Sequence, residues 1–134
     1  INKDLEDYKT VVNSSVSKNG ITIQLNEVIL DKDEIIISTT VKSDTSLGAV
    51  GEISPFGSVY INNEKISSAS GGGSKQIDEY TTEAVLSYQL DKNLPNGDLN
   101  IEIKYTDALI IGAGKEIEGP WTFKFKANGD TLAI

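Results

Sequence analysis

The stretch GITIQLNEVILDKDEIIISTTVKS, residues 20–43, decides the fold of this chain. Apolar residues alternate with polar ones from Ile21 to Leu25, a pattern typical of a half-buried strand. The alternation slips by one residue at Asn26–Glu27, and Val28 resumes it. A slip of one residue would turn the later core residues outward unless an extra residue is absorbed. We therefore predict a long strand interrupted by a β-bulge.

The second half of the same stretch predicts the return strand of a hairpin. Asp31-Lys32-Asp33 has the polar composition of a turn. After this turn, alternate side chains are expected to face the core: Ile35, Ile37, Thr39 and Val41. Residues 31–34 could also offer oxygen ligands to calcium, but the glycine and closing glutamate of a calcium-binding loop are missing. We therefore interpret them as an acidic turn.

Alternating segments on both sides of the hairpin predict further strands. They lie around Thr10–Val16, Val59–Ile61, Tyr80–Leu90, Leu99–Tyr105 and Trp121–Phe125. Turn-forming residues separate most of them, and no helical period is sustained. The sequence therefore predicts an all-β fold, an immunoglobulin-like antiparallel β-sandwich of about seven strands. A barrel is the alternative, because periodicity alone does not say whether a sheet closes.

The length of 134 residues suits a single domain, residues 1–134. Residues 1–8 are expected to form a charged lead-in, and the Gly/Ser-rich residues 67–75 a flexible loop. Residues 44–57 are interpreted as a long connection between sheets. Four of its side chains are expected to contact the core: Leu47, Val50, Ile53 and Phe56.

The composition excludes several classes of function. The chain contains no Cys, His or Met, and all twelve of its basic residues are Lys. Without Cys or His, the usual nucleophile pairs of hydrolases cannot form. The carboxylates of Glu83 and Glu102 are expected to face outward, and no pair can be placed in a cleft. A net charge of −8 would repel nucleic acid. We therefore expect no enzyme, no cofactor, no metal site and no nucleic-acid partner.

One apolar segment is a candidate interaction loop: Ala108, Leu109, Ile110 and Ile111. It joins the last two predicted strands. It is interpreted as a strand extension that covers one end of the sandwich, and alternatively as an exposed patch that marks an interaction site. The single tryptophan, Trp121, and the neighbouring Phe123 and Phe125 are expected in the core, where an aromatic ring buries a large area.

Several segments together resemble a known family. They are DYKT (7–10), NGITI (19–23), LNEVILD (25–31), IISTTVKSD (36–44), VYINNE (59–64) and GPWTFKF (119–125). The chain is similar to the domain of unknown function 4179 of Gram-positive bacteria. The resemblance implies an extracytoplasmic domain that follows a single membrane-spanning helix, in proteins described as anti-sigma-factor-like. The family has no catalytic residues to transfer.

The expected function follows from this resemblance and from the exclusions. We expect a non-enzymatic extracellular sensor or interaction domain of a membrane-anchored, anti-sigma-factor-like regulatory protein. Its partner would be an unknown protein or an envelope ligand, and it would meet the membrane only through a helix outside this sequence. The missing methionine also suggests a processed chain or a piece of a longer protein. The alternative is a secreted or wall-attached carbohydrate-binding or adhesion module, which would present exposed aromatic side chains.

Overall fold

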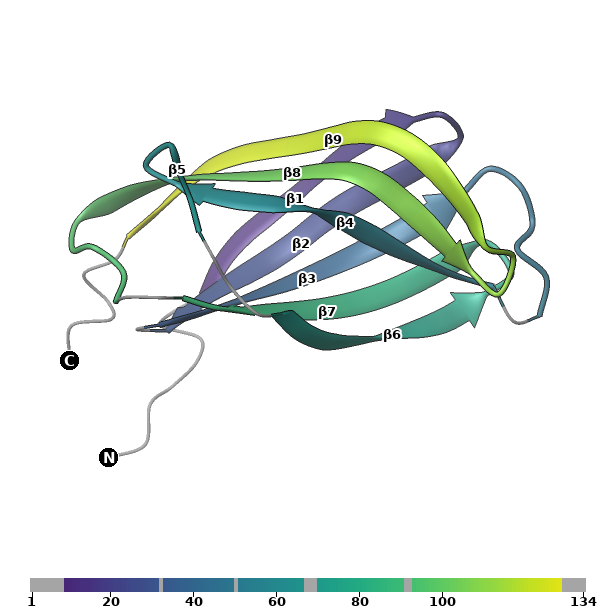
Figure 1. Ribbon diagram of the computed structural model, residues 1–134, viewed down its shortest axis with the longest axis horizontal. Coiled ribbons are helices and arrows are strands. Elements are labelled where there is room, and N and C mark those ends of the chain that lie inside the picture. Colours follow the sequence, from purple (N-terminus) through teal and green to yellow (C-terminus); the bar gives the residue numbers. More distant parts are fainter. Residues whose placement is uncertain (1–8, 32, 50, 67–69, 91–92, 129–134) are drawn as a thin grey trace.

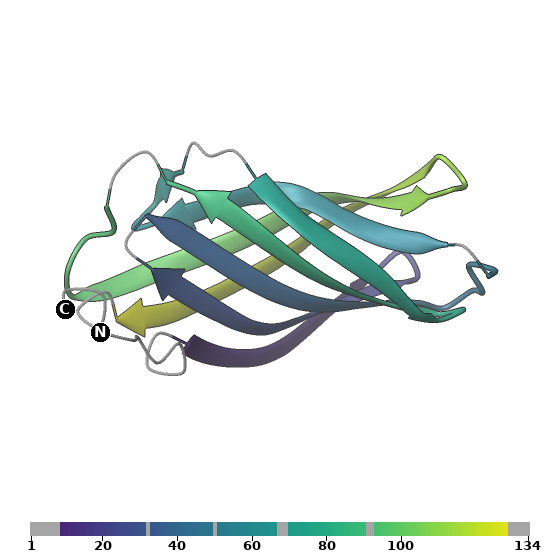
Figure 2. The same ribbon diagram turned by 90° about the horizontal axis from the view of Figure 1, so that it is seen from below.

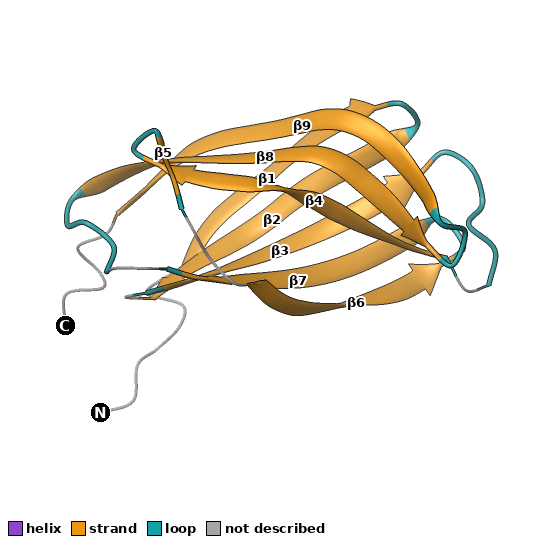
Figure 3. Cartoon of the chain, viewed as in Figure 1, coloured by secondary structure: helices purple, strands orange, loops and turns teal. Residues whose placement is uncertain are grey.

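The computed structural model describes residues 9–31, 33–49, 51–66, 70–90 and 93–128, and it is built from strands (Figures 1 and 3). These described ranges form nine strands: β1 (Lys9–Lys18), β2 (Ile21–Asp31), β3 (Glu34–Ser43), β4 (Glu52–Ile61), β5 (Glu64–Lys65), β6 (Ser70–Asp78), β7 (Thr81–Gln89), β8 (Asp98–Ile111) and β9 (Lys115–Asn128). Among the described residues, no helix is long and apolar enough to cross a membrane. The predicted lead-in, residues 1–8, lies outside the described residues.

The strands form two antiparallel sheets that pack face to face (Figures 1 and 2). One sheet has five strands in the order β1-β2-β3-β7-β6, and the other has four in the order β5-β4-β8-β9. All pairings between neighbours are antiparallel. The predicted all-β fold of two packed sheets is therefore confirmed.

The β2–β3 hairpin has the predicted bulge. Leu25 pairs with Thr39 and Glu27 pairs with Ser38, so the register shifts by one residue at Asn26. The Asn26 side chain donates to Thr40 Oγ1 at 2.9 Å, which gives the extra residue a hydrogen bond on the outer face. The bulge keeps Ile21, Ile23 and Leu25 in phase with Val28 and Leu30, and all five are buried.

The core lies between the two sheets. Its largest fully buried side chains are Trp121 and Tyr105, and the inward residues of β2, β3 and β8 surround them. The Tyr105 and Phe123 rings meet edge to face with their centroids 6.3 Å apart. The expectation that Trp121 and Phe123 belong to the core is confirmed, whereas Phe125 packs against it half-buried.

Three sequence expectations are wrong. The predicted connection 44–57 becomes strand β4 from Glu52 onward, because its backbone pairs with β8. The predicted loop 67–75 is strand β6 from Ser70 onward, because its backbone pairs with β7 despite the glycines; residues 67–69 lie outside the described part. Phe56 does not contact the core but is 50% exposed. It belongs to β4, where Ile53 and Pro55 occupy the inward positions and the alternation turns Phe56 outward. Val50 lies outside the described residues.

The outer ends of the first and last strands lie at one end of the sandwich, and three hairpin turns lie at the other. The start of β1 and the end of β9 lie at one end, on the left in Figure 1. The β1–β2, β6–β7 and β8–β9 turns lie at the opposite end, which we call the far end (Figures 1 and 2). Backbone hydrogen bonds from Ser43 to Tyr80 and from Leu47 to Glu79 fasten the segment after β3 to the β6–β7 turn at this end.

Candidate functional site

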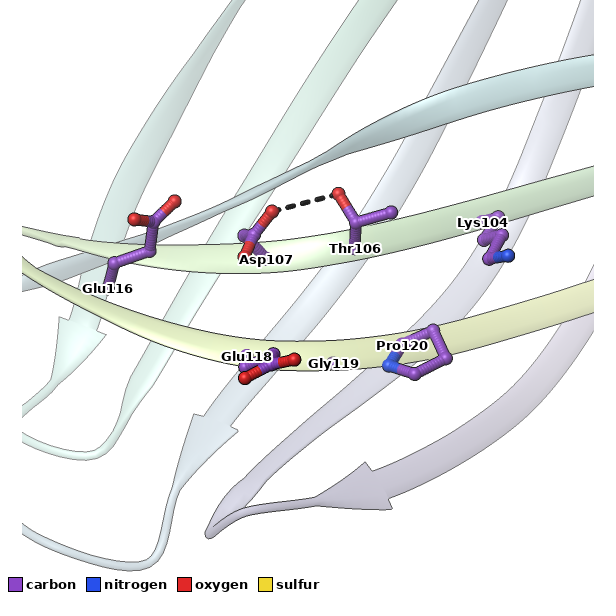
Figure 4. A pocket seen from close by; sticks show the side chains of 7 residues that line it. All are labelled: Lys104, Thr106, Asp107, Glu116, Glu118, Gly119 and Pro120. Atoms are coloured by element: carbon purple, nitrogen blue, oxygen red, sulfur yellow. Dashed lines mark hydrogen bonds between the residues drawn. The ribbon is translucent and has the colours of Figure 1, made fainter.

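Acidic side chains gather in a shallow depression on the outer face of β8 and β9 (Figure 4). The register of β8 against β9 shifts between Tyr105 and Asp107, where Thr106 faces two β9 residues, Gly119 and Pro120, and Asp107 pairs with Glu118 across the strands. Thr106 Oγ1 donates to Asp107 Oδ2 at 2.9 Å. The depression has a volume of about 530 Å³, and its lining includes Asp107, Glu116, Glu118 and a single cation, Lys104.

In the ranges that the structure describes, no group of three or more carboxylates is arranged to hold a metal ion. The same finding covers the acidic β2–β3 turn, whose described members are Asp31, Asp33 and Glu34. No His or Cys is present in the chain to act as a base or nucleophile. The acidic depression places negative charge on this face of β8 and β9.

An apolar patch borders the acidic depression on the same outer face. Phe56 of β4 pairs with Asp107 of β8, and the next outward positions along β8 are Leu109 and Ile111. Phe56 and Leu109 are diagonal cross-strand neighbours, a spacing that an aromatic side chain can bridge. Phe56 is 50% and Ile111 44% exposed, and Leu109 is half-buried. We call Phe56, Leu109 and Ile111 the β4–β8 patch.

The structure divides the predicted interaction loop between the two faces of a strand. The residues 108–111 end β8, so the predicted strand extension is confirmed. Ala108 and Ile110 are buried in the core at the far end, whereas Leu109 and Ile111 point outward. Sequence reasoning missed Phe56, although the alternation of Ile53 and Pro55 could have indicated its outward direction. The role of this segment in binding stays a prediction.

A second depression lies on the outer face of the five-stranded sheet, above β3, β7 and β6. Its volume is about 520 Å³, and Gly73, Lys75, Glu83 and Val85 are among the residues that line it. Gly73 pairs with Val85 and Lys75 with Glu83. Since cross-strand partners share a face, the missing side chain at Gly73 leaves Val85 open to solvent, with 48% of it exposed.

Among the described residues, two hydroxyl groups in the core have no hydrogen-bond partner: Tyr105 Oη and Thr39 Oγ1. Burial raises the pKa of Tyr105 far above its usual value, because the phenolate would lose its hydration, and the nearby Tyr88 raises it further. Neither hydroxyl reaches solvent, so they bear on stability rather than on a surface site.

The aromatic platform of a sugar-binding site is not formed by Trp121. Its ring is fully buried, and Nε1 donates to the Ile21 carbonyl at 3.0 Å. The exposed aromatic side chains are Phe56 on β4 and Tyr80 in the β6–β7 turn, among the residues described.

Comparison with protein families agrees with the resemblance expected from the sequence. The family model described as Domain of unknown function (DUF4179) matches residues 1–43. The match covers β1, the β2–β3 hairpin and its bulge. No protein of curated function matches the chain.

One solved structure shares the fold. It is described as the crystal structure of the conserved domain protein from Bacillus anthracis, and it superposes with a TM-score of 0.71 at 20% sequence identity. The match covers 94% of this chain and 44% of that protein. This chain therefore spans less than half the length of that protein, and at this identity the likeness concerns the fold alone.

Proposed function

We propose, from the DUF4179 match over residues 1–43, that this chain is a non-enzymatic extracellular sensor or interaction domain of a membrane-anchored, anti-sigma-factor-like regulatory protein. We further propose that its two sheets are arranged as an immunoglobulin-like sandwich. The domain binds a protein or an envelope ligand through the outer face of its four-stranded sheet.

The observation that carries this proposal is the β4–β8 patch beside the acidic depression. Phe56 and Ile111 expose large apolar surfaces on the strands β4 and β8, and Asp107, Glu116 and Glu118 place negative charge along the side of the patch that faces β9. An apolar centre with a polar rim is the usual composition of a protein-binding surface. Such a surface binds a partner without needing reactive groups.

The position of the patch suits a domain tethered to a membrane. Because the start of β1 and the end of β9 lie at one end, a tether through either of them leaves the far end free. Ile111 is the last residue of β8 and lies toward that far end. A partner could therefore reach the patch without meeting the membrane.

A cross-linking experiment tests the patch in the full-length protein. Phe56→Ser combined with Ile111→Ser removes the two most exposed side chains of the patch, and Val11→Ser is the matched control. Val11 is also an exposed apolar residue, but it lies on β1 of the other sheet. We expect a discrete cross-linked partner in intact cells, lost in the double variant and retained in the control.

The proposal is wrong if the double variant keeps the same cross-linked partner and the same regulatory output as the parent protein. Saturable binding to purified cell-wall glycans that depends on Phe56, with no protein partner, would instead establish the carbohydrate-binding alternative. Far-UV circular dichroism of each variant shows whether the fold is retained, since outward side chains contribute little to the core.

A further inference from the structure

We propose that the open edge of β6 accepts an extended segment of a partner protein, which adds a strand beside Gly71–Gly73 and places a Lys or Arg side chain over Val85. In the sheet order, β6 is an outer strand whose described pairing is with β7 alone. An unpaired strand edge is a template for another strand. This surface is on the opposite sheet from the β4–β8 patch, so the inference is independent of the proposed function.

The other sheet edges are protected against strand addition, whereas β6 is not. β1 is interrupted by a bulge at Asn13, whose φ is +47°. The outer strand β5 has only two residues, and the part of β4 beyond it contains Pro55. β9 contains Pro120, and proline has no N–H to offer a further strand. β6 has no proline, and its register is regular from its start to Gln76.

Two of the three consecutive glycines on β6 are not required by the packing of this chain. A Cβ at Gly72 would lie 2.2 Å from the Val85 carbonyl oxygen, so glycine is needed there. A Cβ at Gly73 would meet nothing within 4 Å, and one at Gly71 would make only ordinary contact with Ser87. Glycine weakens a strand and often marks a close approach of another backbone. The glycines at 71 and 73 leave that approach open.

Contacts of this chain cover the rest of β6 and limit the open part to these glycines. Ser74 Oγ donates to Glu52 Oε2 at 2.7 Å, and Gln76 Nε2 donates to the Gly48 carbonyl at 2.8 Å. Both contacts bring the segment that leads into β4 against the far half of β6. A partner segment therefore pairs with the other half of β6, which contains Gly71–Gly73.

The second depression determines the chemistry of the incoming side chain. An added strand would lie about 4.8 Å beyond β6, and the bare Gly73 would let a long side chain cross toward β7. There the exposed Val85 would contact its methylenes, and Glu83, two residues away on the same face, would meet its charged end. The described structure holds no ion pair between Glu83 and its cross-strand neighbour Lys75. With a net charge of −8 on the chain, a basic segment is favoured over a second copy.

A peptide titration of the 134-residue chain tests the proposal by nuclear magnetic resonance. The probe is a capped heptapeptide with Lys at alternate positions and Val or Thr between them. One control peptide has Glu in place of Lys, and the other has two central prolines and so cannot pair as a strand. We expect saturable shifts of the Gly71, Gly72 and Gly73 amides with the Lys peptide and none with either control.

Two variants separate strand addition from general charge attraction. The Cβ added by Gly73→Val would meet nothing within 4 Å, and the side chain would fill the path above Val85, so we expect the variant to remove peptide binding while the melting temperature stays the same or rises. Glu83→Gln should weaken binding by about 3-fold, the effect of losing one exposed ion pair. Equal binding by the proline peptide, or unchanged binding to Gly73→Val, would overturn the proposal.

Three further outcomes would overturn the proposal. Shifts centred on the acidic depression of β8 and β9 instead of β6 would mean charge attraction alone and would overturn the proposal. Concentration-dependent dimerisation of the free chain that Gly73→Val abolishes would make a second copy the occupant and would also overturn it. The proposal would also be overturned if millimolar Lys peptide caused no saturable shift of the amide resonances.

Discussion

Trp121 and Ile21 connect the two sheets through the core: the indole N–H of Trp121 donates to the backbone carbonyl of Ile21 at 3.0 Å. Trp121 lies on β9 of the four-stranded sheet, and Ile21 begins β2 of the five-stranded sheet. Both residues are buried. On the surface nearby, Asn19 Nδ2 donates to the Glu118 carbonyl at 2.7 Å. Together these bonds fasten the β1–β2 turn to β9.

Trp121→Phe should lower the free energy of unfolding by about 3 kcal/mol, because it leaves a cavity and removes the buried hydrogen bond to the Ile21 carbonyl. Urea denaturation measures this change. Phe125→Leu on the same strand is the control, and we expect a loss of about 1 kcal/mol because Phe125 is only half-buried. Equal losses in the two variants would show that the bond to Ile21 contributes nothing.

Gly57→Ala should destabilise the protein strongly, whereas Gly73→Ala should not. Gly57 lies at the register shift between β4 and β8, and a Cβ there would lie 1.8 Å from the Lys104 carbonyl oxygen. Backbone cannot move aside easily, so we expect a loss of about 3 kcal/mol for Gly57→Ala. Gly73 has open space, and its change should stay within about 0.5 kcal/mol. Thermal melting of both variants compares them, and a tolerated Gly57→Ala would contradict the described bulge.

Tyr105→Phe should raise the free energy of unfolding by about 1 kcal/mol, because it removes a buried hydroxyl that has no partner. The ring remains, and with it the edge-to-face contact with Phe123. Thr39→Val removes the other unpartnered hydroxyl with little change in shape, and we expect a gain of similar size. A loss in both variants would mean that the hydroxyls are hydrogen-bonded in solution.

The protein should lose stability as the pH rises above about 10, the ordinary pKa of tyrosine. Burial raises the pKa of Tyr105 in the folded state, and burial also raises that of Tyr88. Above pH 10 the unfolded chain releases these protons while the folded chain keeps them, so the folded state binds more protons and its stability falls with pH. Urea midpoints between pH 8 and 11.5 measure the slope. Tyr105→Phe should reduce it, and an unchanged slope would contradict the burial of Tyr105.

Most of the β-hairpin could be predicted from the sequence because its alternation is regular. The bulge at Asn26 follows from a one-residue slip, and the outward direction of Val85 follows from its place between Ala84 and Leu86. These are local properties of a half-buried strand, for which the side-chain period of two fixes the face.

The errors arose where tertiary pairing outweighs local preference. The glycines of β6 favour a loop in isolation, but β7 supplies a ladder of hydrogen bonds that orders them. The apolar character of Phe56 predicts a core position. β4 begins earlier than the sequence predicts and sets the opposite phase, so Phe56 faces outward. The β4–β8 patch combines residues about fifty positions apart. Only the pairing of β4 with β8 brings Phe56 to Leu109, and local patterns do not contain that pairing.

The most direct test of the account is whether this domain lies outside the cell membrane. The chain has no cysteine, so Lys65→Cys on the exposed strand β5 would give this domain a single reactive thiol. Val59→Cys is the buried control. Intact cells that make the full-length protein would be treated with a membrane-impermeant maleimide. The account predicts labelling of Lys65→Cys in intact cells and little labelling of Val59→Cys. Labelling of Lys65→Cys only after the cells are lysed would contradict an extracellular domain.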